Sequence, residues 1–119
     1  MKWLKPYFNQ FLDQPIIIRS SNKTNIIIGN TASLLCQIQG YPNPTITWLK
    51  NDMPVPSSKY TTDSSGLTIL TIENATVLDN GKYQCKGVNN LGKASSPAAL
   101  ITVGCELLPT IFFVLLRCL

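Results

Sequence analysis

The sequence contains no histidine, and only 13% of its residues are charged. Histidine is the usual general base in catalysis and the commonest protein ligand of metal ions. Without it, no serine or cysteine of this chain has the customary partner that would activate it as a nucleophile. The six acidic residues are spread along the chain and form no evident acid–base pair. We therefore predict a protein that is not an enzyme, has no catalytic residues and no cofactor, and acts on no small-molecule substrate.

Patterns for metal binding and nucleic-acid binding are missing as well. The four cysteines, at positions 36, 85, 105 and 118, show no C-x-x-C spacing, which disfavours a zinc site. The net charge is +4, and the ten lysines and arginines are scattered, without a basic run interleaved with aromatic residues. We therefore expect no metal and no nucleic-acid partner, and the charges are typical of a solvated surface.

The chain also lacks a long apolar segment. Residues 1–14 contain no uninterrupted apolar stretch of roughly 7–15 residues, so no secretory signal is predicted there. Residues 107–116 are apolar, but Pro109 breaks them, and they amount to about half of the ~20 residues that span a bilayer. As written, the chain is expected in the cytoplasm or cytoskeleton. The alternative is a fragment of a cell-surface or secreted protein whose signal lies upstream, and membrane association stays open.

What the chain does contain is a set of fixed points between Leu34 and Cys85. Cys36 and Cys85 lie 49 positions apart, and Trp48 follows the first cysteine by 12 positions. Around these points apolar and polar residues alternate, which indicates β-strands, because successive side chains of a strand point to opposite faces. Two facing sheets that the cysteines bridge and the tryptophan fills explain this spacing.

This pattern resembles an immunoglobulin domain. The run at 79–85 (DNGKYQC) is similar to the tyrosine corner of that family, and the run at 85–92 (CKGVNNLG) is similar to the C-x-A-x-N-x-x-G run of its intermediate, or I-set, subtype. Such motifs are shared by the immunoglobulin domains of myosin light-chain kinase and titin-like proteins and by those of cell-adhesion receptors. The resemblance implies an all-β fold: an immunoglobulin-like β-sandwich of two antiparallel sheets with I-set topology.

The resemblance also implies roles for single residues. In oxidising surroundings Cys36 and Cys85 would form a disulfide worth on the order of 4 kcal/mol, whereas in a reducing cytosol they would remain small buried apolar groups. Asp79 would be a structural acid paired with a basic residue, for which we name Lys59. The expected core side chains are Trp48, Leu70, Ile72 and Tyr83.

The first strand and the strand before the tyrosine corner need separate interpretation. The isoleucine runs at 16–18 and 26–28 correspond to the split first strand of the I-set. The tripeptide L-T-I occurs twice in positions 67–72, so the register is ambiguous, and a slip of one residue would bury the opposite set of side chains. The spacing of the family favours burial of Leu70 and Ile72.

The last strand departs from the family in two places. Pro97 interrupts its middle, and Val103 falls one position late, so the sequence predicts a β-bulge that absorbs both. In the preceding strand, Gly87 replaces the usual alanine, which predicts a slightly thinner core.

The domain boundaries follow from these assignments. Residues 1–5 are expected to be a flexible N-terminus, residues 6–103 the I-set domain, and residues 104–119 an apolar tail outside the sandwich. Three interpretations of the tail stay open: a disordered segment, the start of a membrane segment, or a segment docked on the domain.

Binding is the function that remains, and loop ends are where sandwich domains commonly bind. The candidate loops are 41–44, 51–58 and 89–92. Tyr41, with Pro42 and Pro44 beside it, is the best single anchor, although any of these residues can simply turn the chain. The expected partners are other proteins, neighbouring immunoglobulin domains among them.

Two functional hypotheses follow from the resemblance. The first is a non-catalytic interaction module of a larger muscle, cytoskeletal or kinase-associated protein. The second is an extracellular adhesion or receptor domain, which the N-x-S/T sequons at Asn22 and Asn74 would favour if they carry glycans.

Overall fold

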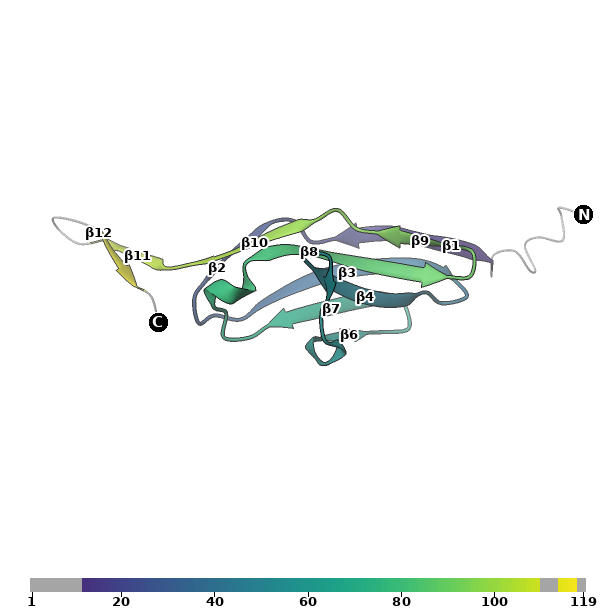
Figure 1. Ribbon diagram of the computed structural model, residues 1–119, viewed down its shortest axis with the longest axis horizontal. Helices are drawn as coiled ribbons and strands as arrows, with labels where there is room; N and C mark the ends of the chain where they lie inside the picture. Colours follow the sequence, from purple (N-terminus) through teal and green to yellow (C-terminus); the bar gives the residue numbers. More distant parts are fainter. Residues whose placement is uncertain (1–11, 110–113, 118–119) are drawn as a thin grey trace, which may run out of the picture.

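The computed structural model of the chain describes residues 12–109 and 114–117 (Figure 1). The predictions of a flexible segment at 1–5 and of a domain start at Pro6 lie outside the described residues. The described chain forms two packed β-sheets and a small two-stranded sheet, as the all-β prediction required, with two short 3₁₀ turns, η3 (Ser57–Lys59) and η4 (Val77–Asp79). The immunoglobulin-like sandwich is therefore confirmed.

Each sheet collects strands from distant parts of the sequence. The first sheet has the order β1-β3-β7-β6, formed by β1 (Asp13–Ser20), β3 (Ala32–Tyr41), β7 (Leu67–Ile72) and β6 (Tyr60–Thr62). The second has the order β2-β10-β8-β4-β5 with β9 beside β8, formed by β2 (Thr24–Ile27), β10 (Ala99–Gly104), β8 (Gly81–Asn89), β4 (Thr45–Lys50), β5 (Met53–Pro54) and β9 (Gly92–Ser95).

The first strand is split between the two sheets. β1 pairs antiparallel with β3 in the first sheet, whereas β2 crosses to the second sheet and pairs parallel with β10. This arrangement places Ile26 in the core, while Ile16 and Ile18 are exposed. The two isoleucine runs thus form the divided first strand of the I-set, and its second half supplies the parallel pair in a fold that is otherwise antiparallel.

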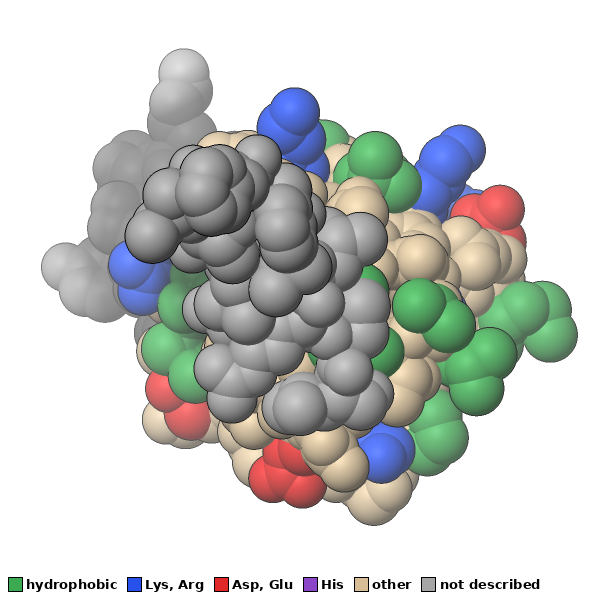
Figure 2. Space-filling model, turned by 90° about the vertical axis from the view of Figure 1, so that its left-hand side faces the viewer, with side chains coloured by type: hydrophobic (Ala, Val, Ile, Leu, Met, Phe, Trp, Pro, Cys, Tyr) green, Lys and Arg blue, Asp and Glu red, His purple; other side chains and the backbone are tan. Residues whose placement is uncertain are grey.

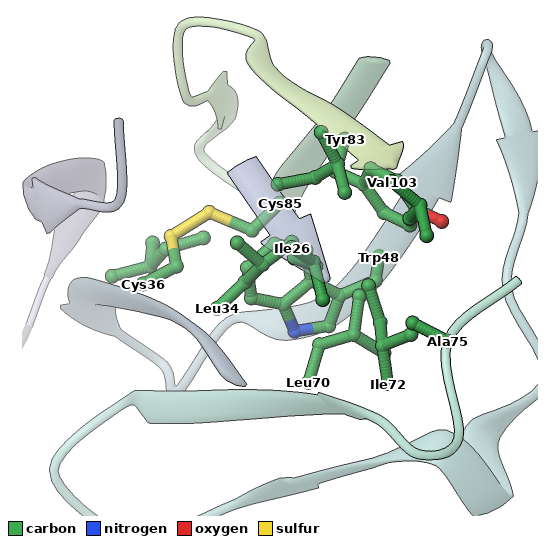
Figure 3. Close-up of a cluster of buried hydrophobic side chains, with 12 residues drawn as sticks. Ile26, Leu34, Cys36, Trp48, Leu70, Ile72, Ala75, Tyr83, Cys85 and Val103 are labelled. Atoms are coloured by element: carbon green, nitrogen blue, oxygen red, sulfur yellow. A yellow bond between two sulfur atoms is a disulfide. The ribbon is translucent and has the colours of Figure 1, made fainter. Parts of the chain in front are cut away.

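The core lies where the two sheets face each other (Figure 3). The disulfide between Cys36 and Cys85 joins β3 to β8 across the sandwich, as predicted. Trp48 lies against this bridge and is 2% exposed, and Tyr83 is also buried. Burying large apolar side chains of this kind contributes about 1.5–3 kcal/mol each.

The register of β7 is set by its pairing with β3. Leu34 lies opposite Leu70, and Ala32 opposite Ile72. Leu70 and Ile72 are 2% and 7% exposed, whereas Ile69 faces solvent. The same register buries Thr68 completely, which makes it a polar member of the core.

A one-residue bulge separates β9 from β10. Tyr83 pairs with Ala99, but three residues later Lys86 pairs with Ser95, so the last strand contains one extra residue between these pairs. Ser96 bridges the irregularity: its hydroxyl accepts the backbone N–H of Cys85 at 3.0 Å, and its own N–H donates to the carbonyl of Cys85 at 2.9 Å. The predicted bulge is therefore confirmed.

The expectation of a thinner core at Gly87 is wrong. A methyl group added there would lie 2.8 Å from Cγ2 of Ile38 and 3.3 Å from Cβ of Pro44. The space is therefore already filled by side chains from β3 and from the loop before β4. An alanine at this position would force the Ile38 side chain to shift, because it approaches the backbone of β8 closely.

The corner before β8 is held by local hydrogen bonds. The Tyr83 hydroxyl donates to the carbonyl of Asp79 at 2.7 Å. The Asp79 carboxylate accepts the backbone N–H of Thr76 at 2.8 Å, and the Thr76 hydroxyl accepts the N–H of Leu78, so the two side chains form a capping box around η4. The expected ion pair between Asp79 and Lys59 does not form within the described part of the chain, because this carboxylate caps the turn instead.

The two described strands after β10 pair with each other. β11 (Glu106–Pro109) and β12 (Val114–Arg117) form a separate two-stranded sheet beyond the end of β10 (Figure 1). This pairing was not predicted from the sequence. Cys105, which precedes it, is disulfide-bonded. Among the described residues, none belongs to a helix long and apolar enough to cross a bilayer.

Candidate binding surface

The loop between β3 and β4 presents the predicted anchor residue. Tyr41 is 47% exposed, Pro42 is exposed, and Pro44 is half-buried against Gly40 and the core. The peptide bond between Tyr41 and Pro42 is cis. Because neither proline can donate a backbone hydrogen bond, the loop cannot extend the pairing of β3 with its neighbours. The Tyr41 ring is thereby presented at the end of the sandwich.

Asn89 ties this loop to two other segments. Its side-chain amide donates to the carbonyl of Asp13 at 2.8 Å and to the carbonyl of Pro42 at 3.0 Å. Its side-chain oxygen accepts the backbone N–H of Leu91 at 2.9 Å. One side chain thus joins the start of β1, the loop after β3 and the turn after β8 into a single surface.

Only two of the three predicted loops meet at this surface. The loops 41–44 and 89–92 lie together, because Thr45 at the start of β4 pairs with Val88 near the end of β8. Loop 51–58 begins at the opposite end of the same pair of strands, where Lys50 pairs with Tyr83. It therefore cannot contribute to the surface around Tyr41.

The clamping role of Asn89 was not recognised from the sequence. The residue was included only as part of a candidate loop. The usable signal was its place in the C-x-A-x-N-x-x-G run, since an asparagine that recurs at one position of a motif suggests a fixed hydrogen-bonding task. We name the surface formed by Asp13, Tyr41, Pro42, Pro44 and 89–92 the clamped end.

A hollow of about 340 Å³ borders the clamped end. It lies between Tyr41 and the turn at 62–66. In that turn the Asp63 carboxylate accepts hydrogen bonds from the Ser65 hydroxyl at 2.6 Å, the Ser65 N–H at 2.8 Å and the Leu67 N–H at 3.1 Å. These bonds, led by the Ser65 hydroxyl, stabilise the ionised form and hold the pKa of Asp63 below its ordinary value.

The opposite end of the molecule has a different character. The exposed residues Val77 and Leu78 of η4 lie at the end where β10 leads to β11, and hydrophobic side chains reach the surface there (Figure 2). Lys50 extends toward this corner, where its ammonium group donates to the carbonyl of Leu78 and lies 5.9 Å from the centre of the Tyr83 ring. No sequence motif had marked Lys50, Val77 or Leu78.

Both sequons lie on the surface. Asn22 is exposed in the link between β1 and β2, and the hydroxyl of Thr24 donates to its carbonyl at 3.2 Å. Asn74 is exposed after β7 and has a left-handed backbone with φ of 49°.

The side chains at the clamped end are suited to contact with another protein surface. The described residues contain no cluster of three or more histidine, cysteine or acidic side chains that could hold a metal ion. An exposed tyrosine, prolines and the exposed Leu91 offer apolar area with one hydroxyl, a combination typical of protein interfaces.

Comparison with known proteins agrees with this description. The chain is 37% identical over 109 residues to smooth-muscle myosin light chain kinase of Gallus gallus, which covers 87% of this chain and 5% of the kinase. It is 36% identical over 109 residues to telokin of Meleagris gallopavo, covering 87% of this chain and 64% of telokin. The chain thus spans less than two thirds of the length of these relatives.

A similar fold is found among solved structures. The titin domains Z1Z2, solved in complex with telethonin, superimpose with a TM-score of 0.74 and 26% identity, covering 82% of this chain and 51% of that one. The family model of the immunoglobulin I-set domain matches residues 15–102. The chain therefore belongs to the immunoglobulin I-set family.

Proposed function

We propose that this chain is a non-catalytic protein-binding module that recognises its partner through the clamped end. The observation that carries the proposal is the double hydrogen bond from Asn89 to Asp13 and Pro42. This clamp fixes three segments before any partner arrives. Preorganisation lowers the conformational entropy that is lost on binding, so a fixed loop surface binds more tightly than a mobile one.

Tyr41 is the proposed anchor of the interface. A tyrosine contributes a large contact area and has only two side-chain torsions to immobilise. Its neighbours Pro42 and Pro44 restrict the backbone on the following side. Anchor residues of this type carry most of the binding free energy in protein interfaces.

The proposed context is a larger muscle, cytoskeletal or kinase-associated protein. The similarity to myosin light chain kinase and telokin supports this context, as does the fact that the chain matches only 5% of the kinase. The titin domains of the similar structure were solved in complex with another protein. The partner would be a protein, and a neighbouring immunoglobulin domain is a natural candidate because β1 starts at the clamped end.

The test measures binding of variants of the whole chain. Partners captured by cross-linking in a muscle extract are purified, and each is titrated with the wild-type chain and with the Tyr41→Ala variant. We expect Tyr41→Ala to weaken binding by about 2 kcal/mol, roughly 30-fold, with an unchanged circular dichroism spectrum. Met53→Ala is the matched control, because Met53 is exposed at the opposite end. Equal binding by the wild type and Tyr41→Ala would refute the proposal.

An extracellular adhesion or receptor module is the second candidate. The disulfide between Cys36 and Cys85 and the exposed sequons at Asn22 and Asn74 favour it. Thiol counting and glycosidase treatment of native material separate the candidates. A glycan on Asn22 or Asn74 would exclude the cytoplasmic context, whereas four free thiols in freshly isolated protein would exclude the extracellular one.

A further inference from the structure

The outward face of the second sheet has an unusual distribution of charge. None of the residues in strands β2, β4, β5, β8, β9 and β10 is acidic. Four lysines lie in these strands, and one of them, Lys50, is turned toward Leu78 and Tyr83. The other three point outward: Lys82 and Lys86 alternate with buried positions of β8, and the exposed Lys93 pairs with the outward Val88. We call this surface the lysine face.

The three lysines lie close enough to act on one partner. Lys82 and Lys86 are four residues apart on β8, which corresponds to roughly 13 Å along a strand. Lys93 is paired with Val88 on the neighbouring strand, one alternate position beyond Lys86. Within the described part of the chain, no acidic side chain forms an ion pair with any of them. The face thus has a positive charge that the fold itself does not neutralise.

Apolar side chains lie beside the lysines. Val88 and Leu100 are exposed on the same face, and Leu100 pairs directly with Lys82. Leu49 of β4 is half-buried opposite Gln84. A surface of this kind can bury apolar area while the neighbouring ammonium groups pair with carboxylates.

We infer that the lysine face binds a protein surface that combines carboxylates with apolar side chains. Charge complementarity selects the acidic partner, since opposite potentials steer association and suppress wrong partners. The apolar side chains favour a protein over a phosphate or sulfate polymer. The face also contains no arginine for bidentate phosphate contacts and no outward aromatic ring on which a base could stack.

This surface borders the clamped end, because Lys93 directly follows Gly92, but the two surfaces share no residue. Tyr41 ends β3 in the first sheet, whereas the three lysines lie on β8 and β9 of the second sheet, so the two proposals rest on different side chains. Failure of the Tyr41→Ala test would leave the lysine face untouched. Failure of the test below would equally leave the clamped end untouched.

The test uses the whole chain labelled with ¹⁵N and two probes, poly-L-glutamate and a copolymer of glutamate and leucine. We expect the copolymer to shift amide resonances of β4, β8 and β9 and to bind more tightly than poly-L-glutamate. The triple variant Lys82→Gln, Lys86→Gln, Lys93→Gln should weaken copolymer binding roughly tenfold, since three exposed ion pairs of modest strength are lost.

A matched variant removes the same charge elsewhere. In Arg19→Gln, Lys23→Gln, Lys59→Gln, three exposed cations are lost from β1, the following link and η3, so both triple variants lower the net charge of +4 equally. The proposal is overturned if this control weakens copolymer binding as much as the lysine-face variant. It is also overturned if the copolymer does not bind at low salt, or if heparin or single-stranded DNA binds the face more tightly.

The apolar part of the inference has its own readout. The double variant Val88→Ser, Leu100→Ser should weaken binding of the copolymer but leave binding of poly-L-glutamate unchanged. Equal loss with both probes would show that the apolar side chains do not select the partner, which would overturn the assignment to a mixed acidic and apolar surface.

Discussion

Replacing Thr68 with valine is expected to destabilise the domain, although valine has nearly the same shape and is more apolar. Thr68 is fully buried, and its hydroxyl oxygen accepts the indole N–H of Trp48 at 2.9 Å. The hydroxyl of Thr62 donates to the same oxygen at 3.0 Å. Valine offers no acceptor, so the indole N–H would be left in the core without a partner.

The magnitude follows from two opposing terms. An orphaned buried donor costs about 1–3 kcal/mol. The methyl group that replaces the hydroxyl recovers about 0.8 kcal/mol of apolar transfer free energy. The Thr62 hydroxyl contributes little to the difference, because Thr62 is exposed and can donate to water. The net loss should be about 0.2–2 kcal/mol, which corresponds to a decrease in Tm of up to roughly 16 °C for a domain of this size.

The assay is equilibrium unfolding in urea, followed by circular dichroism so that tryptophan substitutions do not change the probe. Thr68→Ser is the control that keeps the acceptor and removes only a methyl group. A double-mutant cycle with Trp48→Phe isolates the hydrogen bond, because phenylalanine has no N–H. In the Trp48→Phe background, Thr68→Val should be neutral or stabilising, with a coupling free energy of about 1 kcal/mol or more.

Two results would refute this reasoning. A Thr68→Val variant as stable as the wild type would show that the indole hydrogen bond contributes nothing net. A Thr68→Val cost that is the same in both Trp48 backgrounds would show that the loss arises from packing rather than from the orphaned donor.

Three further predictions concern the turn, the core and the tyrosine corner. Gly66→Ala should lower the free energy of unfolding by about 3 kcal/mol or more, because φ is +81° and the added methyl would lie 1.8 Å from the carbonyl oxygen of Ile38. The control is Gly104→Ala, which should be near neutral in the same urea titration because no atom lies within 4 Å of the added methyl. Gly87→Ala should cost about 1–3 kcal/mol through its clash with Ile38, and the double variant with Ile38→Ala, which removes both Cγ2 and Cδ1 of that side chain, should cost less than the sum of the two; strict additivity would contradict the clash. Burial, with a smaller contribution from the Asp79 charge, raises the pKa of Tyr83 from 10.0 to about 12, so its contribution to stability is complete below pH 10 and is lost as the pH rises to 12. Ultraviolet titration of tyrosinate should show one late phase that Tyr83→Phe removes, and a late phase that persists in this variant would contradict the assignment.

The sequence was informative where the fold depends on local alternation and on a few fixed spacings. The spacing of Cys36, Trp48 and Cys85 indicates three side chains that lie between the two sheets. The run DNGKYQC predicts the tyrosine corner because the contacts of that corner lie within a few residues of each other. The bulge near Pro97 was predictable for the same reason, because an imino acid cannot complete a ladder and a late Val103 requires one extra residue.

Contacts between distant segments were not readable in this way. Alternation shows which residues share a face, but it does not show what lies opposite them. Asp79 was assigned to Lys59 by analogy, whereas the nearby Thr76 offers a backbone N–H three residues away and forms the capping box. The clamp by Asn89 joins residues 76 positions apart, which no local pattern encodes.

The chain by itself thus determined that two sheets face each other, that a sulfur bridge and an indole ring lie between them, and where the strands turn. Only the tertiary structure decided which polar groups enter the core and which side chains fill the space beside each glycine. The physical reason is that a buried hydrogen-bond donor needs an acceptor and the space beside a glycine needs a side chain to fill it. Residues of the opposite sheet, distant in sequence, supply both. For the Trp48 indole that is Thr68, and for the space above Gly87 it is Ile38.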